Sequence, residues 1–404
     1  MDQVILMEWV SFAVRWLHVI TAIAWIGSSF YFIALDLGLN RSIPGPADGE
    51  EWLVHGGGFY HIQKYMVAPA NMPEHLIWFK WESYATWLSG AALLAVVYWM
   101  GAELYLIDPE KADLAIWQAV TISAGSLAIG WVLYDQLCKS PLGEHPMVLM
   151  LILFAILVVM SWGYTQVFTG RAALLHLGAF TATIMTANVF LIIIPNQTIV
   201  VADLKAGRTP DAKYGKIAKL RSTHNNYLTL PVIFLMLSNH YPLSFATEHN
   251  WIIASLVFLM GVTIRHFFNT MHAKGGTLWW TWGATTAIFI AIVWLSMPSG
   301  DAVEDLAEGS VPPRLAHLVD DPHFESVRDI TLSRCSMCHA AEPLWDGIAT
   351  APKGVKLETD AQIAAHAREI YLHAGVSRAM PPANITYMEP EERAAIVAWF
   401  TMTR

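Results

Sequence analysis

Residues 146–164 read PMVLMLILFAILVVMSWGY, an apolar run without a charged side chain. A helix needs about 20 mostly apolar residues to cross a bilayer. The run meets this requirement, and Trp162 and Tyr164 near its end belong to the residue types that favour the lipid–water interface. The whole chain is similarly apolar, with 55% hydrophobic residues, 14% charged residues and a mean hydropathy of +0.42. The sequence therefore predicts a protein embedded in a lipid bilayer.

Further apolar segments bring the predicted number of membrane-spanning helices to eight. Trp and Tyr residues gather at the ends of these segments, as expected for anchors at the membrane interface. We therefore expect an all-α protein in which residues 1–297 form an eight-helix transmembrane bundle. The predicted spans are 9–35, 84–101, 114–134, 146–164, 172–195, 227–243, 251–268 and 277–297.

The five residues 335–339 read CSMCH, the C-x-x-C-H pattern of covalent haem c attachment. Two thiols on one helical turn can both reach the vinyl groups of one porphyrin, and the adjacent His339 can then bind the iron. A zinc site would need a second pair of ligands at similar spacing, and the only other cysteine, Cys138, lies far away in an apolar stretch. We therefore expect one haem c, bound by Cys335, Cys338 and His339.

Met380 is the predicted second axial ligand of this haem. Electron-transfer haems commonly pair His with Met, which raises the reduction potential. Pro381 and Pro382 follow Met380 and stiffen the loop that carries it. Met388 is the alternative ligand. Met380 also has a purely structural interpretation, in which its side chain only fills the core.

A helical pattern begins at Pro390, after the Met loop, so residues 324–404 resemble a small class I cytochrome c domain. Residues 298–323 are rich in Pro, Gly, Asp and Glu and predict a periplasmic linker between the two domains. The formal net charge of -9 provides no basic patch for nucleic acid, so we expect no nucleic-acid partner.

The orientation in the membrane follows from two arguments. Haem c is attached on the periplasmic side of bacterial membranes, which places the cytochrome domain outside, and eight spans then place the N-terminus outside as well. Lys and Arg concentrate in cytoplasmic loops, and the predicted cytoplasmic loops contain eleven of them against two, Lys111 and Arg171, in the periplasmic loops between spans. We expect a multi-pass protein of the bacterial inner membrane with a periplasmic N-terminus and cytochrome domain.

Polar side chains inside spans are costly, and by default they mark function. They also have structural interpretations, since a membrane His often only joins helices, an Asn can cap a helix, and Arg or Lys can reach the interface. The sequence leaves open whether a haem b also binds between the helices. Its candidate axial ligands are four histidines, His18, His176, His240 and His266.

An eight-span domain followed by a cytochrome c resembles the membrane-bound bacterial urate oxidases, the cytochrome c urate hydroxylase family. The resemblance covers essentially the whole chain. It implies oxidation and hydration of urate to 5-hydroxyisourate, with electrons leaving through haem c to a soluble cytochrome c or a terminal oxidase. The segments that carry it are WLHVITAIAWIGSSFYF (16–32), HGGGFYHIQKY (55–65), WFKWESYATWLSG (78–90), STHNNYLTLPVIFLMLSNHYP (222–242) and IRHFFNTMH (264–272).

Oxidation of urate, a planar anion, needs a base, hydrogen-bond donors and a balancing positive charge. We assign catalytic roles to Thr223, His224, Asn225 and Lys64, and substrate binding to Asn226, His61, Arg15 and Lys80. A site at the cytoplasmic face would have to send electrons across about 30 Å of hydrocarbon to the periplasmic haem. Either the site lies nearer the periplasm, or an intramembrane cofactor relays the charge.

Two other functions are compatible with the sequence, because a fold does not by itself decide function. The first is a respiratory membrane cytochrome c that receives electrons from quinol or a partner and performs no small-molecule chemistry. The second is a transporter or sensor with an appended cytochrome. The dense polar groups argue against a simple membrane anchor, yet they do not separate an enzyme from a transporter.

Overall fold

A computed structural model describes residues 3–66, 69, 72–109, 111–297, 311, 313–348 and 351–403. The described residues are mostly helical and contain one two-stranded sheet. The prediction of a helical protein is therefore confirmed. The chain divides into two compact units, the first formed by Met1–Asn239 with Leu243–Ser296 and the second by His240–Pro242 with Met297–Arg404.

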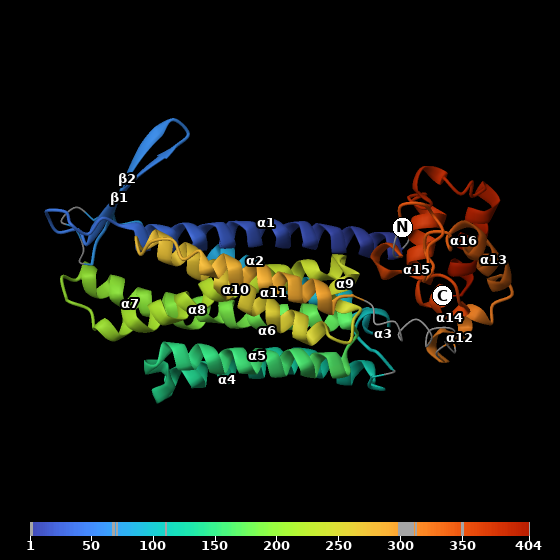
Figure 1. Cartoon of the computed structure of the whole chain (residues 1–404), viewed down its shortest axis with the longest axis horizontal. Coiled ribbons are helices and arrows are strands. Elements are labelled where there is room, and N and C mark those ends of the chain that lie inside the picture. Colours follow the sequence, from blue (N-terminus) through green and yellow to red (C-terminus); the bar gives the residue numbers. More distant parts are fainter. Residues whose placement is uncertain are drawn as a thin grey trace. The chain divides into compact units, whose positions relative to one another are not determined.

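The first unit is a bundle of long helices (Figure 1). Two of the long helices change to π-helical geometry along their length, α2 at η1 and α6 at η3. The elements are α1 Gln3–Gly38, β1 Gly49–His55, β2 Gly58–Lys64, α2 Trp81–Leu93, η1 Leu94–Trp99, α3 Ala102–Tyr105, α4 Ile116–Lys139, η2 Pro141–Glu144, α5 Pro146–Val167, α6 Gly170–Ala187, η3 Asn188–Ile193, α7 Ile194–Lys205, α8 Ala212–Leu237, η4 Ser238–His240, α9 Pro242–Phe245, α10 Asn250–His272 and α11 Trp280–Leu295.

Five described helices are long and apolar enough to cross a membrane: Ile5–Gly38, Ile116–Lys139, Pro146–Val167, Gly170–Lys205 and Asn250–His272. The apolar helix Trp280–Leu295 is shorter. The remaining two predicted spans, 84–101 and 227–243, fall on α2 with η1 and on α8, which are helical but outside this set. The long apolar helices are compatible with membrane insertion, while the count of eight spans stays a prediction.

Helix α8 begins at Ala212, well before the predicted boundary at residue 227. Its first half contains the polar run of residues 213–226, which a search for apolar segments does not recognise as part of a span. Side chains of this run are nevertheless buried, among them Arg221, His224, Asn225 and Asn226. The helix therefore carries polar groups into the interior of the bundle.

Glycines allow two pairs of helices to approach closely, as small residues do in membrane bundles. A Cβ on Gly130 of α4 would lie 2.0 Å from the ring of Phe180 on α6. A Cβ on Gly261 of α10 would lie 2.5 Å from the ring of Pro231 on α8. These contacts hold α4 against α6, and α8 against α10.

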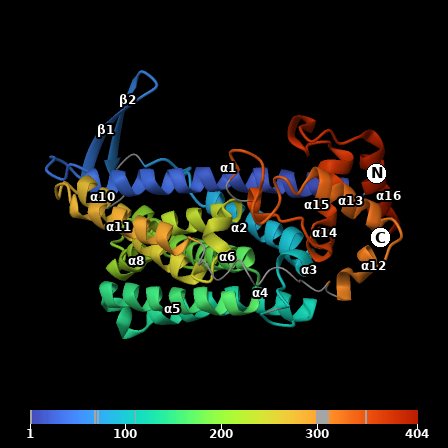
Figure 2. The same cartoon turned by 45° about the vertical axis from the view of Figure 1, so that its right-hand side comes forward.

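The predicted first cytoplasmic loop contains an antiparallel hairpin, β1 with β2, which projects from one end of the bundle (Figures 1 and 2). Its pairing runs from Gly49 opposite Lys64 to His55 opposite Gly58. The turn residues Gly56 and Gly57 have φ of 59° and 79°, the left-handed values that a tight two-residue hairpin turn requires. The glycine run 56–58 is therefore a hairpin turn.

The second unit is a small helical domain around its own apolar core. Phe324 and Val327 of the first long helix pack in this core with Ile396 and Trp399 of the last helix. Its elements are η6 Pro313–Leu315, α12 Ala316–Val319, α13 Phe324–Arg334, η7 Pro352–Gly354, α14 Asp360–Ala365, α15 Ala367–Ile370, η8 Tyr371–Val376, η9 Pro382–Asn384 and α16 Pro390–Met402. Within the predicted linker, residues 298–310 and 312 lie outside the described residues.

Candidate functional site

The CSMCH motif forms a tight turn at the end of α13. The backbone N–H of Cys335 donates to the carbonyl of Thr331 at 2.9 Å, and the N–H groups of Cys338 and His339 donate to the carbonyl of Cys335 at 3.1 and 2.9 Å. Both cysteines are free thiols on this turn. Burial raises the pKa of the Cys335 thiol to about 12, so the free thiol stays protonated at neutral pH.

His339 is held in an orientation that suits an iron ligand. Its Nδ1 lies 2.8 Å from the carbonyl oxygen of Val355. A carbonyl only accepts hydrogen bonds, so Nδ1 carries the proton and Nε2 keeps its lone pair. The carbonyl of His339 accepts a hydrogen bond from the N–H of Leu357 at 2.7 Å, which fixes the backbone as well.

Met380 lies in a loop that α16 anchors. Its N–H donates to the carbonyl of His373 at 2.8 Å, and its carbonyl accepts a hydrogen bond from Arg393 Nη1 at 2.8 Å. The Met380 side chain is 37% exposed, whereas Met388 is 2% exposed and belongs to the apolar core. Met388 would have to leave this core to bind iron, so the packing favours Met380 among the two candidates.

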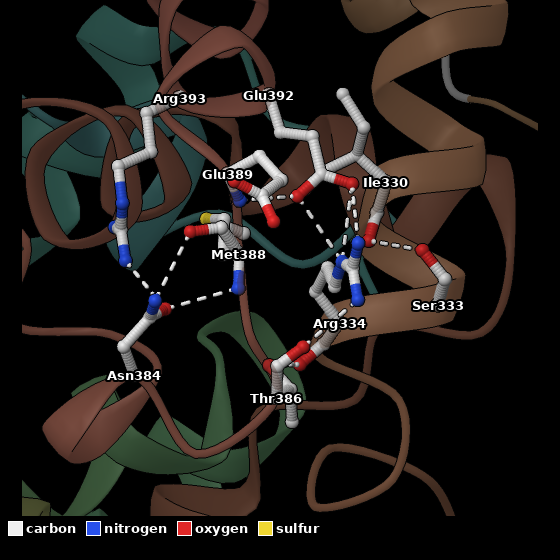
Figure 3. Close-up of polar contacts among 9 residues, drawn as sticks. All are labelled: Ile330, Ser333, Arg334, Asn384, Thr386, Met388, Glu389, Glu392 and Arg393. Atoms are coloured by element: carbon white, nitrogen blue, oxygen red, sulfur yellow. Dashed lines mark hydrogen bonds and ion pairs between the residues drawn. The ribbon is translucent and has the colours of Figure 1, made fainter.

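A network of hydrogen bonds and an ion pair connects the CSMCH turn to the loop that follows Met380 (Figure 3). Arg334, which precedes Cys335, bonds both carboxylate oxygens of Glu392 through Nε at 3.0 and 3.1 Å. Arg334 Nη1 also donates to the carbonyl of Thr386 at 2.9 Å, and the Thr386 hydroxyl donates back to the carbonyl of Arg334 at 2.9 Å. Asn384 bonds the backbone N–H and carbonyl of Met388 and accepts from Arg393.

These residues fit a covalently attached haem. Two free thiols share one turn, the Nε2 lone pair of His339 is available, and Met380 sits at the surface on an anchored loop. In the described part of the chain, no group of three or more His, Cys, Asp or Glu side chains forms an alternative metal site.

The four histidines proposed for a haem b lie in different bonding situations. His176 uses both ring nitrogens, donating from Nδ1 to the carbonyl of Ala172 at 2.7 Å and accepting from Ser123 at Nε2 over 2.8 Å, so it does not fit an axial ligand. His18 Nδ1 bonds the carbonyl of Thr86 at 2.9 Å, which leaves Nε2. His266 Nδ1 lies 3.4 Å from the hydroxyl of Tyr227, and His240 is the last residue of η4.

The buried polar face of α8 builds a cluster between α4, η3 and α8, which we call the Asn188 cluster. It consists of Tyr134, Asp135, Asn188, Arg221, His224 and Asn225. Asn188 stands at its centre, since its Nδ2 donates to the Asn225 Oδ1 at 2.9 Å and to the Tyr134 hydroxyl at 3.1 Å. Asn188 is also the first residue of η3, and π-helical turns inside longer helices are frequent at functional positions.

A buried ion pair closes the Asn188 cluster. Arg221 Nη2 lies 2.7 Å from Asp135 Oδ1, and Arg221 Nη1 donates to the Asn188 Oδ1 at 3.1 Å. The Tyr134 hydroxyl accepts a hydrogen bond from Asn188, and the same hydroxyl shares a hydrogen bond with His224 Nδ1 at 2.8 Å. The Nε2 of His224 is buried and has no hydrogen-bond partner.

A second cluster, the Arg265 cluster, joins α1, α8 and α10 through Phe30, Asn226, Arg265 and Asn269. Arg265 donates from Nη2 to the Asn269 Oδ1 at 2.9 Å, and its guanidinium lies 4.1 Å from the centre of the Phe30 ring. Asn226 Oδ1 accepts from Asn269 Nδ2 at 2.8 Å, and Asn226 Nδ2 is buried without a partner. No carboxylate among the described residues forms an ion pair with Arg265.

The other predicted site residues lie elsewhere. Lys64 pairs with Asp36, and His61 pairs with Glu50 at 2.7 Å on the hairpin. The remaining three have no contact with His224 among the described interactions: Thr223 is exposed and bonds the Lys219 carbonyl, Arg15 is exposed on α1, and Lys80 precedes α2 with its amine 5.8 Å from the Trp81 ring. The structure thus brings His224 and Asn225 together and separates them from the other six.

The model of the urate oxidase N-terminal family matches residues 4–296 of this sequence. The chain belongs to the urate oxidase N-terminal family. This membership points to an oxidoreductase that acts on urate, and the match covers the helical bundle up to the end of α11. No curated protein and no solved structure matches the chain.

Sequence reasoning about this family member missed the partners of His224. Tyr134 and Asp135 lie at the end of α4, and Arg221 lies in a stretch that was predicted to be a cytoplasmic loop. The available signal was the absence of Pro from residues 212–230, which allows one helix to continue through this stretch. In such a helix, His224 and Asn225 follow Arg221 by three and four positions, so both lie one turn away from Arg221 on the same face of α8.

Proposed function

We propose that this member of the urate oxidase N-terminal family oxidises urate to 5-hydroxyisourate and delivers the electrons through a haem c. The match of the family model to residues 4–296 is the observation that carries the proposal. The geometry of Cys335, Cys338, His339 and Met380 supports the cofactor, because these residues meet the requirements of a covalent haem with His and Met ligands.

The proposed reaction balances without oxygen. The urate monoanion and one water give neutral 5-hydroxyisourate, one proton and two electrons. A bond forms between the water oxygen and C5 of the purine, and the electrons leave in two single steps. The oxidant is a terminal oxidase or a soluble cytochrome c, and two molecules of the cytochrome take up one electron each.

The residues of the second unit would hold and orient the cofactor. A bound haem c supplies a one-electron acceptor whose potential the axial ligands set. Val355 fixes the ring of His339 through Nδ1, and Arg393 fixes the backbone of Met380. A haem b in the bundle would require ligands other than His176, since both of its nitrogens are already bonded.

The proposed location is the bacterial inner membrane, with eight spans and with the N-terminus and the haem domain in the periplasm. The long apolar helices and the distribution of Lys and Arg between the loops support this arrangement. This arrangement can be tested in intact cells by labelling single cysteines that are introduced either into the hairpin or into the second unit. Only the second unit should react with a reagent that does not cross the membrane.

The activity is tested by adding urate to the purified, oxidised full chain without oxygen. We expect the absorption bands of reduced haem c to appear, with two haems reduced for each urate consumed. The Cys335→Ser, Cys338→Ser double variant should lose covalent haem and this response. Reduction by a quinol but not by urate would instead support a respiratory cytochrome c. Alkaline pyridine spectra of the same protein would show whether any haem b accompanies the haem c.

A further inference from the structure

The first unit contains a cavity of about 580 Å³ where α6 begins, formed by segments that are far apart in the sequence. Lys111 precedes α4, Gln166 and Arg171 flank the turn between α5 and α6, and Phe245 and Trp251 flank the turn before α10. Its volume falls in the usual range for small-molecule sites. We call it the Lys111–Arg171 cavity.

The walls of the cavity are fixed by hydrogen bonds and close packing. The Thr169 hydroxyl donates to the Tyr105 carbonyl at 2.8 Å and accepts from the N–H of Ala172 at 3.2 Å, so it caps α6. Asn250 Nδ2 donates to the Phe245 carbonyl at 3.0 Å. A Cβ on Gly170 would lie 2.3 Å from that same carbonyl, so only glycine permits this close approach. The cavity is therefore preorganised.

The charge around the cavity is suited to an anion. Arg171 and Lys111 both line it, and the first turn of α6 presents N–H groups at the positive end of the helix dipole. Arg171 Nε is buried without a hydrogen-bond partner, and no carboxylate among the described residues forms an ion pair with Arg171. Lys111 pairs with Asp108 at 3.4 Å and donates to the Phe168 carbonyl at 3.3 Å. The Glu248 carboxylate, which also lines the cavity, lies 3.9 Å from His249, and the Glu248 side chain is 72% exposed.

The uncharged lining matches a planar purine. Trp251 and Phe245 provide aromatic side chains, and the carboxamide of Gln166 provides a polar group for carbonyl and N–H edges. The Thr165 hydroxyl already donates to the Trp162 carbonyl at 2.7 Å. Gln166 Nε2 donates to Thr165 at 3.2 Å, which leaves the Gln166 oxygen free to accept. Aromatic side chains, a carboxamide and the guanidinium of Arg171 are together suited to recognition of the urate monoanion.

The position of the cavity also suits the path of the electrons. Thr247 lines it and donates to the carbonyl of Leu295, the last residue of α11, at 3.2 Å. Figure 1 shows the neighbouring helices α3 and α9 at the end of the bundle away from the hairpin. In the proposed topology no span follows α11, which assigns the haem-binding residues to the side of the membrane at which α11 ends.

We propose that the Lys111–Arg171 cavity binds the urate monoanion as the substrate of the oxidation, an assignment that rests on the proposed function. Electrons from urate in this position avoid the passage across about 30 Å of hydrocarbon. Asn188 lies eighteen positions beyond Gly170 along α6 and η3, or about 27 Å at the rise of a helix. His224 in the Asn188 cluster is then out of reach of the same urate, so this placement and a catalytic base at His224 exclude each other.

The test compares Arg171→Gln and Lys111→Gln with the wild-type full chain. Steady-state urate oxidation with a soluble cytochrome c as acceptor should show KM for urate raised about tenfold in Arg171→Gln, with kcat within about threefold. Lys111→Gln should show a smaller increase, and Arg171→Lys should keep most of the affinity. Arg208→Gln is the matched control, because Arg208 is an exposed arginine paired with Asp203 and should leave KM unchanged. Absorption of the bound haem and thermal unfolding establish that each variant is folded.

Direct binding separates this assignment from the proposed activity. Calorimetric titration of urate without an electron acceptor should show binding to wild type and weaker binding to Arg171→Gln, whether or not the haem is reduced. Unchanged binding and unchanged KM in Arg171→Gln would overturn the assignment, even if urate reduces the wild-type haem. Loss of urate affinity in Arg265→Gln together with full affinity in Arg171→Gln would also overturn it and place the anion in the Arg265 cluster.

Discussion

Arg393 Nη1 donates a hydrogen bond to the carbonyl oxygen of Met380 at 2.8 Å. The same guanidinium bonds the carbonyl of Ala374 at 2.5 Å and the Asn384 Oδ1 at 3.0 Å. One buried side chain of α16 therefore joins η8, the backbone of Met380 and η9. Arg393 thus holds the backbone at Met380, the residue whose sulfur is the proposed iron ligand.

Substitution of Arg393 should therefore lower the reduction potential of the haem. In Arg393→Gln the loop would lose its anchor and Met ligation would weaken, and Met is the ligand that raises the potential. Redox titration of the purified protein measures this change. Arg328→Gln is the matched control, because the ion pairs of Arg328, with Glu325 and Asp329 on α13 and with Asp360 on α14, do not involve the Met380 loop. Equal potentials in Arg393→Gln and the control would show that the loop is held without this arginine.

The two candidate methionines should respond differently to removal of sulfur. Met380→Leu should remove the axial ligand and convert the low-spin ferric haem to a high-spin or differently ligated species. Met388→Leu should keep the ligand and lower stability by less than about 1.5 kcal/mol, because the swap nearly conserves volume in a packed core. Visible and near-infrared spectra of the two variants measure this difference. The opposite pattern would identify Met388 as the ligand.

The fold was predictable where the physical signal is local. Helix α5 begins at Pro146, the residue at which the predicted span begins, because a proline suits the first helical turn and an apolar run follows. Helix α8 was not predictable in the same way, because its first half is polar. Those polar groups are stable in the bundle only through partners on α4 and η3, and a single sequence does not reveal these pairings.

The two candidate sites also differ in how far the sequence alone predicts them. The haem residues Cys335, Cys338 and His339 are adjacent in sequence, so their chemistry can be recognised from the motif alone. The Lys111–Arg171 cavity combines three distant turns, and Arg171 alone resembles an ordinary interfacial arginine. Only the folded chain shows that its guanidinium borders a cavity and lacks a carboxylate partner.

Removal of one partner of the Arg221–Asp135 ion pair should destabilise the bundle. Asp135→Asn would leave the charge of Arg221 in the interior, which costs roughly 3 kcal/mol or more when one partner of a buried pair is removed. The double variant Asp135→Asn, Arg221→Gln should be more stable than the sum of the single effects predicts. Thermal unfolding in detergent measures all four proteins of this cycle. Strictly additive effects would mean that the two charges do not interact.

Acid should weaken the second unit through Glu392. Burial raises the pKa of Glu392, but hydrogen bonds from Arg334 and from the Glu389 N–H outweigh burial and hold the pKa below its ordinary value. A lowered pKa in the folded state stabilises the fold at neutral pH, and this contribution disappears as the pH falls from the ordinary glutamate value through the lowered one. Glu392→Gln should be less stable at neutral pH and should lose less stability on acidification. Acid unfolding followed by the haem absorption of both proteins measures the difference, and parallel curves would contradict it.

His224 decides between the two placements of urate in the bundle. With urate in the Lys111–Arg171 cavity, His224 has a structural role, since its Nδ1 shares a hydrogen bond with Tyr134 within the Asn188 cluster. His224→Gln should then leave the KM for urate within about twofold of wild type and should leave the pH profile of kcat unchanged. Thermal unfolding should show a loss of stability of about 1–3 kcal/mol, as expected when a buried hydrogen bond is disturbed. A catalytic base at His224 predicts the reverse, because kcat would fall at least a hundredfold and the acidic limb of its pH profile would vanish while the protein stayed folded.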